Sequence, residues 1–313
     1  MNMQRNVLHT VLLLVFFSLW CFPQANAQEG PLILTICTQK SEPYTQVRAA
    51  FRNHLSRYFP NAEYNHYHAA DDDNSLILYP ETADRQPTLI LSLGTKAAQE
   101  AQLYFPDTPL VATMILNDDV LDPQIPHTGI KLALTPEIQL SWLVKFLPQV
   151  KRVGVLYNPE QNSDWIIEAE RVARKMDMEI IGVEIHSPRQ LQERLTIISN
   201  NADALLAIPD QTVYSGRTAK EVLLFSYRNR IPFVGLSSSW VKAGALYALE
   251  VDYEHLGLLC AEKAKKIIEG QLADTIPLSS PTMVTYTINE RTEKYLRLEF
   301  SPGLIHGASR IFE

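Results

Sequence analysis

The sequence predicts an α/β protein made of two doubly wound parallel-sheet lobes joined by a hinge. Short β-branched runs alternate with longer stretches whose apolar residues recur about every 3.6 positions, and this alternation is typical of parallel strands covered by helices on both faces. One set of alternating strands and helices extends to about Leu134, and a second set begins at Lys151. A chain of 313 residues is long enough for two such units.

The predicted strands are buried apolar runs, each followed by a polar or glycine-containing turn. They cover residues 32–38, 88–93, 110–115, 153–157, 180–185, 204–208 and 232–236. The predicted helices cover residues 44–57, 95–104, 137–147, 163–176, 188–198, 218–228 and 253–269. Two helices have a recognisable start, because Thr135 precedes Pro136 and Ser187 precedes Pro188, which places a capping residue before a proline at the first helical position.

The N-terminus has the three-part layout of a secretory signal peptide. Arg5 is followed by an apolar run over residues 11–22, then by Pro23 and the small-residue tripeptide at residues 25–27. The run is shorter than the roughly 20 apolar residues that a membrane helix needs. We therefore expect residues 1–27 to be removed as a signal peptide. Cys21 follows the bulky Trp20, which does not fit a lipoprotein signal.

Composition excludes several classes of function. The formal net charge is −7, and no basic cluster of the kind that binds nucleic acid or anionic membrane is present. Beyond the signal peptide only Cys37 and Cys260 remain, without the spacing of a zinc or redox motif. An oxidising compartment permits a disulfide between them, whereas two small buried thiols explain the same residues.

The sequence offers little for catalysis or for a cofactor. Ser239 and Lys242 match the S-x-x-K spacing of penicillin-binding enzymes, but the partner motifs S-D-N and K-T-G are absent, as is the G-x-S-x-G elbow of hydrolases. His66 and His68 precede the three aspartates 71–73, a set that suits a metal ion. A strand edge that enters an acidic turn explains these residues equally well. We predict no enzyme, no metal and no cofactor.

Polar residues that directly follow the predicted strands are the candidate binding groups, since ligands of doubly wound sheets lie outside the carboxyl ends of the strands. Gly94 and Thr95 follow a strand and open a helix, so their backbone N–H groups are available to an anion or carboxylate. Residues 158–163, with the sequence NPEQNS, occupy the equivalent place in the second half. Asp210 either receives a cation or hydroxyl of the ligand or caps a helix before Gln211.

Two segments resemble the ABC transporter substrate-binding proteins related to the tryptophan- and tyrosine-binding proteins. Residues 151–163, KRVGVLYNPEQNS, are similar to K-R-[VI]-G-[VI]-L-Y-N-P-x-x-x-N-S of that family. Residues 243–257, AGALYALEVDYEHLG, are similar to G-A-[LI]-A-[AS]-x-x-x-D-Y-x-x-L-G. Weaker correspondences lie at residues 92–98, 205–213 and 231–237, so the resemblance covers nearly the whole mature chain.

The resemblance implies a type I periplasmic-binding fold, with linkers near Leu134, Ala245 and Ser279. It predicts an N-terminal lobe of residues 28–134 plus 246–279 and a C-terminal lobe of residues 135–245 plus 280–313. A ligand in the cleft between the lobes is expected to contact a polar rim. Its members are Gln39, Ser41, Gly94, Thr95, Tyr157, Asn158, Asn162, Ser163, Asp210, Ser237 and Ser238.

The implied function is that of a monomeric periplasmic protein that captures a small-molecule ligand for an ABC permease. The alternative is a periplasmic ligand sensor that docks on a membrane-bound signalling partner. One departure from the family bears on the ligand: many members have an acidic residue after the strand near residue 235, where this chain has three serines, Ser237–Ser239. An ammonium group would lose a charged partner there, so an amino acid is not the expected ligand.

Overall fold

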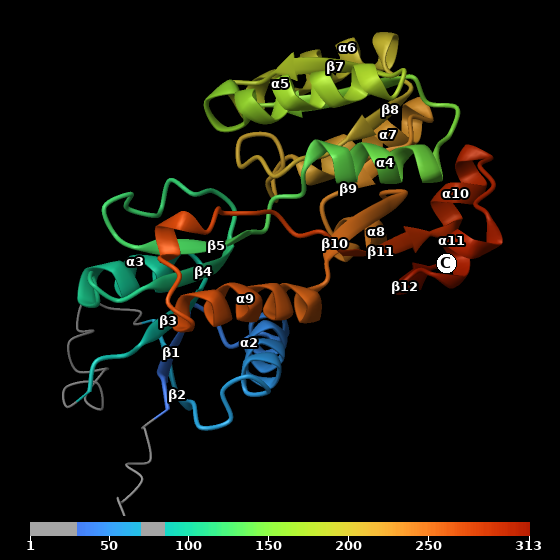
Figure 1. Cartoon of the computed structure of the whole chain (residues 1–313). Helices are drawn as coiled ribbons and strands as arrows, with labels where there is room; N and C mark the ends of the chain where they lie inside the picture. The colour runs from blue at the N-terminus through green and yellow to red at the C-terminus, as the bar shows by residue number, and fades with distance from the viewer. Residues whose placement is uncertain (1–29, 70–84) are drawn as a thin grey trace, which may run out of the picture.

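The computed structural model describes residues 30–69 and 85–313, which fold into two α/β lobes (Figure 1). The first lobe is built on a five-stranded sheet in the order β2-β1-β3-β4-β5, and the second on a seven-stranded sheet in the order β12-β11-β10-β9-β8-β6-β7. No helix in the described ranges is long and apolar enough to cross a membrane. All seven predicted strands and all seven predicted helices are present, with ends shifted by a few residues.

The sheet of the first lobe is parallel throughout. Its strands are β1 (Leu32–Cys37), β2 (Glu63–His68), β3 (Leu89–Leu93), β4 (Leu110–Ile115) and β5 (His127–Lys131). Its helices are α2 (Glu42–Leu55), α3 (Thr95–Tyr104) and α9 (Tyr253–Ile268), followed by a 3-10 turn at Ala273–Thr275. Because α9 comes from late in the chain, the first lobe is assembled from two separate segments.

The sheet of the second lobe is parallel except where β11 runs antiparallel to β10. Its strands are β6 (Arg152–Tyr157), β7 (Glu179–Glu184), β8 (Ala204–Leu206), β9 (Phe233–Gly235), β10 (Tyr247–Val251), β11 (Val284–Asn289) and β12 (Arg310–Phe312). Its helices are α4 (Pro136–Phe146), α5 (Pro159–Lys175), α6 (Leu191–Asn201), α7 (Ala219–Asn229), α8 (Ser238–Lys242), α10 (Glu290–Leu296) and α11 (Pro302–His306), with a 3-10 turn at Pro188–Gln190.

The chain crosses between the two sheets three times. It passes from β5 to α4 across Leu134, from β10 to α9 at Asp252, and from a segment at Ser279 to β11. The second crossing corrects the boundary predicted near Ala245. Residues 247–251 form β10, which pairs with β9 and β11 of the second sheet, so only the residues that follow Val251 join the first lobe.

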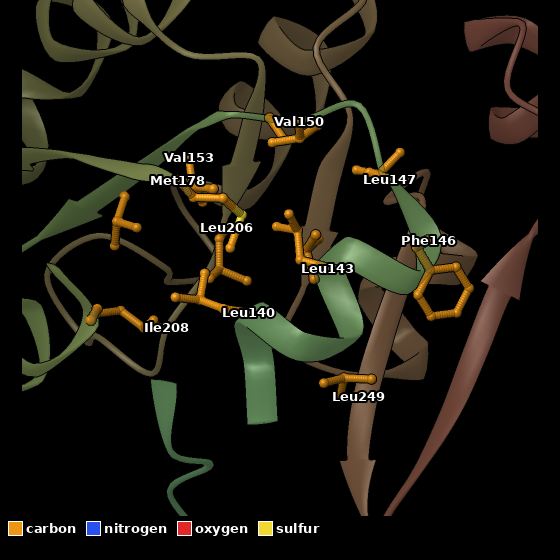
Figure 2. Packing of buried hydrophobic residues seen from close by; sticks show 14 of the residues in the cluster. Leu140, Leu143, Phe146, Leu147, Val150, Val153, Met178, Leu206, Ile208 and Leu249 are labelled. Carbon is orange, nitrogen blue, oxygen red and sulfur yellow. The ribbon is translucent and has the colours of Figure 1, made fainter. Parts of the chain in front are cut away.

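Each lobe has its own apolar core. In the second lobe, α4 places Leu140 and Leu143 against the sheet near Leu206 and Val153 (Figure 2). In the first lobe, α2 and α9 pack side by side over the sheet and bury Phe51, among other residues. Removal of this much apolar surface from water is the main stabilising term of each lobe.

Gly257 makes the close packing of α9 on α2 possible. A Cβ atom at this position would clash with the backbone oxygen of Val47 and lie 2.7 Å from the Cβ of Ala50. The two helices approach this closely only because residue 257 has no side chain, and any side chain would force them apart.

We expect Gly257→Ala to lower the free energy of unfolding by about 1–3 kcal/mol, because the added methyl group separates α2 from α9. Gly303→Ala on α11 is the matched control, since nothing lies within 4 Å of its Cβ position. That change should leave stability the same or raise it by less than about 1 kcal/mol. Urea unfolding measures both, and equal midpoints for the two variants would contradict the packing argument.

Candidate functional site

The turn after β3 has a backbone shape that only glycine adopts readily. Gly94 has a φ of 100° and stands at the N-cap of α3. The space beside it is filled by Thr38, whose Oγ1 lies 2.6 Å from the position of a Cβ on Gly94 and accepts a hydrogen bond from the Ala97 N–H at 3.1 Å. Thr95 is exposed directly after this turn. The predicted pair Gly94 and Thr95 therefore lies at the carboxyl edge of the first sheet.

A hollow of about 260 Å³, here called the first-lobe hollow, lies at the carboxyl ends of β1 and β2. Its lining residues are Cys37, Gln39, Lys40, Tyr44, Thr45, Arg48, His66 and His68. The predicted residue Gln39 thus lies in the wall of this hollow. Ser41 is exposed beside it, where it precedes α2 and its hydroxyl donates to the Oε1 of Gln39 at 3.4 Å.

In the second lobe, the carboxylate of Asp210 ties together the loops after β6 and β8. Oδ2 accepts hydrogen bonds from the backbone N–H of Asn158 at 2.7 Å and from the Nδ2 of Asn162 at 2.9 Å. Oδ1 accepts from the backbone N–H groups of Thr212 at 2.9 Å and Val213 at 3.0 Å. Asp210 is buried, and its four hydrogen bonds compensate for the desolvation of its charge.

Asn158, Asn162 and Ser163 are also engaged within the protein. Asn158 caps α5 by accepting from the Glu160 N–H at 3.1 Å, and it donates to the hydroxyl of Thr212 at 2.9 Å. The Ser163 hydroxyl donates to the carbonyl of Pro159 at 2.6 Å. These predicted binding residues gather at one loop cluster, but their side chains hold that cluster in shape.

Tyr157 lies on the core side of the second sheet. It belongs to the apolar cluster under α5, and its hydroxyl donates to Glu184 at 3.3 Å. Burial and the neighbouring Glu184 carboxylate raise the pKa of the phenol. Tyr214 and Trp240, two other aromatic residues of this lobe, pack against Phe233. Tyr44, in contrast, lines the first-lobe hollow.

A cavity of about 190 Å³, here called the inter-lobe cavity, is lined by residues of both lobes beside the crossings. Its lining residues are Leu116, Leu132, Leu134, Gln139, Leu206, Ala207, Pro209, Val234, Gly235, Leu236, Ser237, Leu249, Glu250, Val251 and Tyr253. The wall is mainly apolar, which is usual for sites that take small organic molecules. Ser237 lies in this wall, whereas Ser238 lines a separate, wider groove next to α2.

Glu250 is the site residue that the sequence did not reveal. It lies on β10 and accepts hydrogen bonds from the Ser238 N–H and from the Thr287 hydroxyl, both at 3.2 Å. A carboxylate is therefore present beside the three serines, supplied by a neighbouring strand. The signal in the sequence was a single charged residue within the otherwise apolar run of residues 247–251.

The structure also bears on the cysteines and on the metal hypothesis. Cys37 and Cys260 are buried free thiols, and burial raises the pKa of each to about 12. Within residues 30–69 and 85–313, no group of three or more histidine, cysteine, aspartate or glutamate residues is arranged to hold a metal ion. His66 and His68 lie on β2 with their rings 4.7 Å apart, and the aspartates 71–73 lie outside the described residues.

Comparison with known proteins places this architecture in a family. A family model described as "ABC transporter substrate binding protein" matches residues 56–310. The tyrosine-binding protein of Clostridioides difficile is 26% identical over 220 residues, which cover 67% of this chain and 63% of that protein. The chain thus spans less than two thirds of the length of this relative. An uncharacterised protein of Rickettsia prowazekii is 23% identical over 222 residues, 70% of each chain.

Solved structures confirm the predicted type I periplasmic-binding fold. The ligand-free, open structure of a substrate-binding protein with adhesive properties from Clostridium difficile has a TM-score of 0.70, at 20% identity over 90% of this chain and 99% of that one. A Streptococcus pneumoniae domain in complex with L-Trp has a TM-score of 0.58, at 14% identity over 90% of this chain and all of that one. The resemblance stated from the two sequence segments is therefore confirmed.

We expect Asp210→Ala to lower the free energy of unfolding by at least about 2 kcal/mol, because it leaves the buried N–H groups of Asn158 and Val213 without an acceptor. Asp164→Ala is the control, since Asp164 is an exposed carboxylate on α5, and its loss should change stability by less than about 0.5 kcal/mol. Urea unfolding of both variants tests this. An effect of Asp210→Ala no larger than the control would show that the loops do not depend on the carboxylate.

Proposed function

Because the chain belongs to the family of ABC transporter substrate-binding proteins, we propose that it captures a small ligand between its lobes and delivers it to an ABC importer. It acts in the periplasm after removal of residues 1–27. The family and the neighbouring structures are binding proteins, so this function requires no catalytic group. The mechanism consists of closure of the lobes around the ligand.

The observation that carries this proposal is the inter-lobe cavity, whose wall combines residues of both lobes. Leu116 and Leu132 come from the first lobe, whereas Pro209, Leu236 and Ser237 come from the second. A ligand that contacts both walls has more contacts when the lobes are closed, and it shifts the equilibrium by the difference in affinity between the two states. The apolar wall suits an apolar ligand body, and Glu250 suits a cationic or hydroxyl group.

The cavity volume of about 190 Å³ is smaller than the ~300–1,000 Å³ of most sites for small molecules. The ligand therefore extends from this cavity along the carboxyl edge of the first sheet, towards Gly94 and Thr95. The Thr95 N–H at the start of α3 is a donor that this edge offers, whereas the Gly94 N–H already donates to the Thr113 carbonyl at 2.8 Å. Tyrosine binding by the relative from Clostridioides difficile supports a ligand of amino acid size.

The first test is a thermal-shift screen of the exported, ligand-stripped protein against amino acids, nucleobases, sugars and small carboxylates. A ligand that binds only the native state raises the melting temperature by mass action, and small-angle scattering should then record a smaller radius of gyration as the lobes close. A hit without any change in the radius of gyration would contradict the closure mechanism. No hit in any class would favour the alternative, a protein that docks on a membrane-bound sensor.

We expect Leu116→Asp to weaken binding of the screened ligand at least tenfold with little change in melting temperature. Leu116 is 45% exposed and lines the inter-lobe cavity, so a carboxylate there opposes an apolar ligand without disturbing a core. Leu103→Asp is the control, because Leu103 is 70% exposed on α3 and is not part of that wall. Calorimetric titration measures both, and equal affinities would remove Leu116 from the site.

A further inference from the structure

The first-lobe hollow carries a positive charge that none of its described lining residues compensates. Lys40 and Arg48 line it, and none of the other lining residues is an aspartate or glutamate. Within the described ranges, neither cation has an ion-pair partner, although eleven other pairs are formed there. Arg48 is half-buried on α2, so its charge is screened less by solvent than that of a fully exposed arginine.

The pKa values of His66 and His68 show that the positive charge acts inside the hollow. The pKa of His66 is lowered to about 4, first by burial and then by Arg48 and His68. The pKa of His68 is also lowered, by burial and by the charges of Lys40 and Arg48. At neutral pH both imidazoles are therefore uncharged. The positive potential of Arg48 and Lys40 reaches the rings that line the hollow, and it would favour an anion in the same place.

Tyr44 links the hollow to the turn after β3. This side chain lines the hollow, and its hydroxyl lies 3.3 Å from the position of a Cβ on Gly94. The ends of β2, β1 and β3 are neighbours in the sheet, so His68, Thr38 and Gly94 follow one another along a single edge. A volume of about 260 Å³ is too small for a whole ligand of ordinary size, but it is sufficient for one end group.

We infer that the first-lobe hollow binds an oxyanion, a carboxylate or phosphate group, at one end of the ligand held in the cleft. The inference rests on the proposed function and specifies the ligand class. Arg48 is the principal partner, because a guanidinium presents parallel N–H donors to two oxygens of one anion. Lys40 adds a second charge from the exposed rim, and the Tyr44 hydroxyl and Gln39 amide are further donors.

The test uses the exported protein with isotope-labelled histidine rings, titrated near pH 7 with sodium phosphate or sodium acetate at constant ionic strength. NMR signals of His66 and His68, assigned with single histidine variants, should shift saturably in the millimolar range. The exposed His306 on α11 provides an internal reference that should not shift. The anion that binds more tightly identifies the end group as phosphate or carboxylate.

Variants of α2 show whether Arg48 is the partner. Arg48→Gln should weaken anion binding about tenfold or more, and Arg48→Lys should give an intermediate affinity because it keeps the charge without the fork. Arg52→Gln is the matched control: Arg52 lies one turn further along α2, over the ring of Tyr64, and does not line the hollow. It should bind the anions as the unaltered protein does. Dispersed histidine signals confirm that each variant is folded.

Two results would overturn the inference. One is the absence of a saturable shift of His66 and His68 with both anions. The other is equal binding by the Arg48→Gln variant and the unaltered protein. Neither of these results tests whether the protein binds a ligand between its lobes, which the thermal-shift screen tests separately. A ligand from the thermal-shift screen that binds the Arg48→Gln variant with unchanged affinity would leave the cleft as the ligand site and exclude the hollow from it.

Discussion

The structure depends on three crossings of the chain that lie next to one another. The segment at Ser279 pairs with β5 through hydrogen bonds from the Lys131 N–H at 2.9 Å and to the Gly129 carbonyl at 3.2 Å. The Asp252 N–H donates to the Met283 carbonyl at 3.4 Å in the same region. Each lobe buries its own core, so the crossings connect two separately packed bodies. The inter-lobe cavity, where the proposed ligand would contact both lobes, lies beside these crossings.

The parts of the fold that the sequence predicted are those in which one local signal decides the outcome. The central strands β1, β3 and β4 are continuous apolar runs, buried at every residue, and such runs identify parallel strands. Five strands of the structure were not predicted, namely β2, β5, β10, β11 and β12. Of these, β5 and β11 lack such a run. In β5, a glycine interrupts the apolar pattern, because the backbone of Ala112 leaves no room for a side chain at Gly129. In β11, threonine alternates with apolar residues. Its pairing with the distant β10 is a tertiary event that no local pattern encodes.

The site was predicted at the level of loops more than of side chains. The rule that ligands lie at the carboxyl ends of parallel strands placed Gln39, Gly94 and Ser237 at or beside hollows, because this rule depends only on topology. It could not tell which polar side chains point to a ligand and which hold the loops. Asp210 and Asn162 bond to each other, and Tyr157 turns into the core. Glu250 was missed because it enters the site from a strand and not from the loops that follow strands.

The two lobes differ in how their polar groups at the cleft edge are satisfied. In the second lobe, the Asp210 carboxylate accepts four hydrogen bonds from its own loops, so its charge is already compensated within the protein. In the first lobe, Lys40 and Arg48 have no carboxylate partner within the described part of the chain. A hydrated cation can replace its water molecules with ligand oxygens at a small cost in free energy. Breaking a buried network whose hydrogen bonds are all satisfied costs several kcal/mol. In the proposed binding mode, the cations of the first lobe therefore gain a partner from the ligand, and the second lobe supplies a preformed wall that is apolar apart from groups such as Glu250 and Ser237.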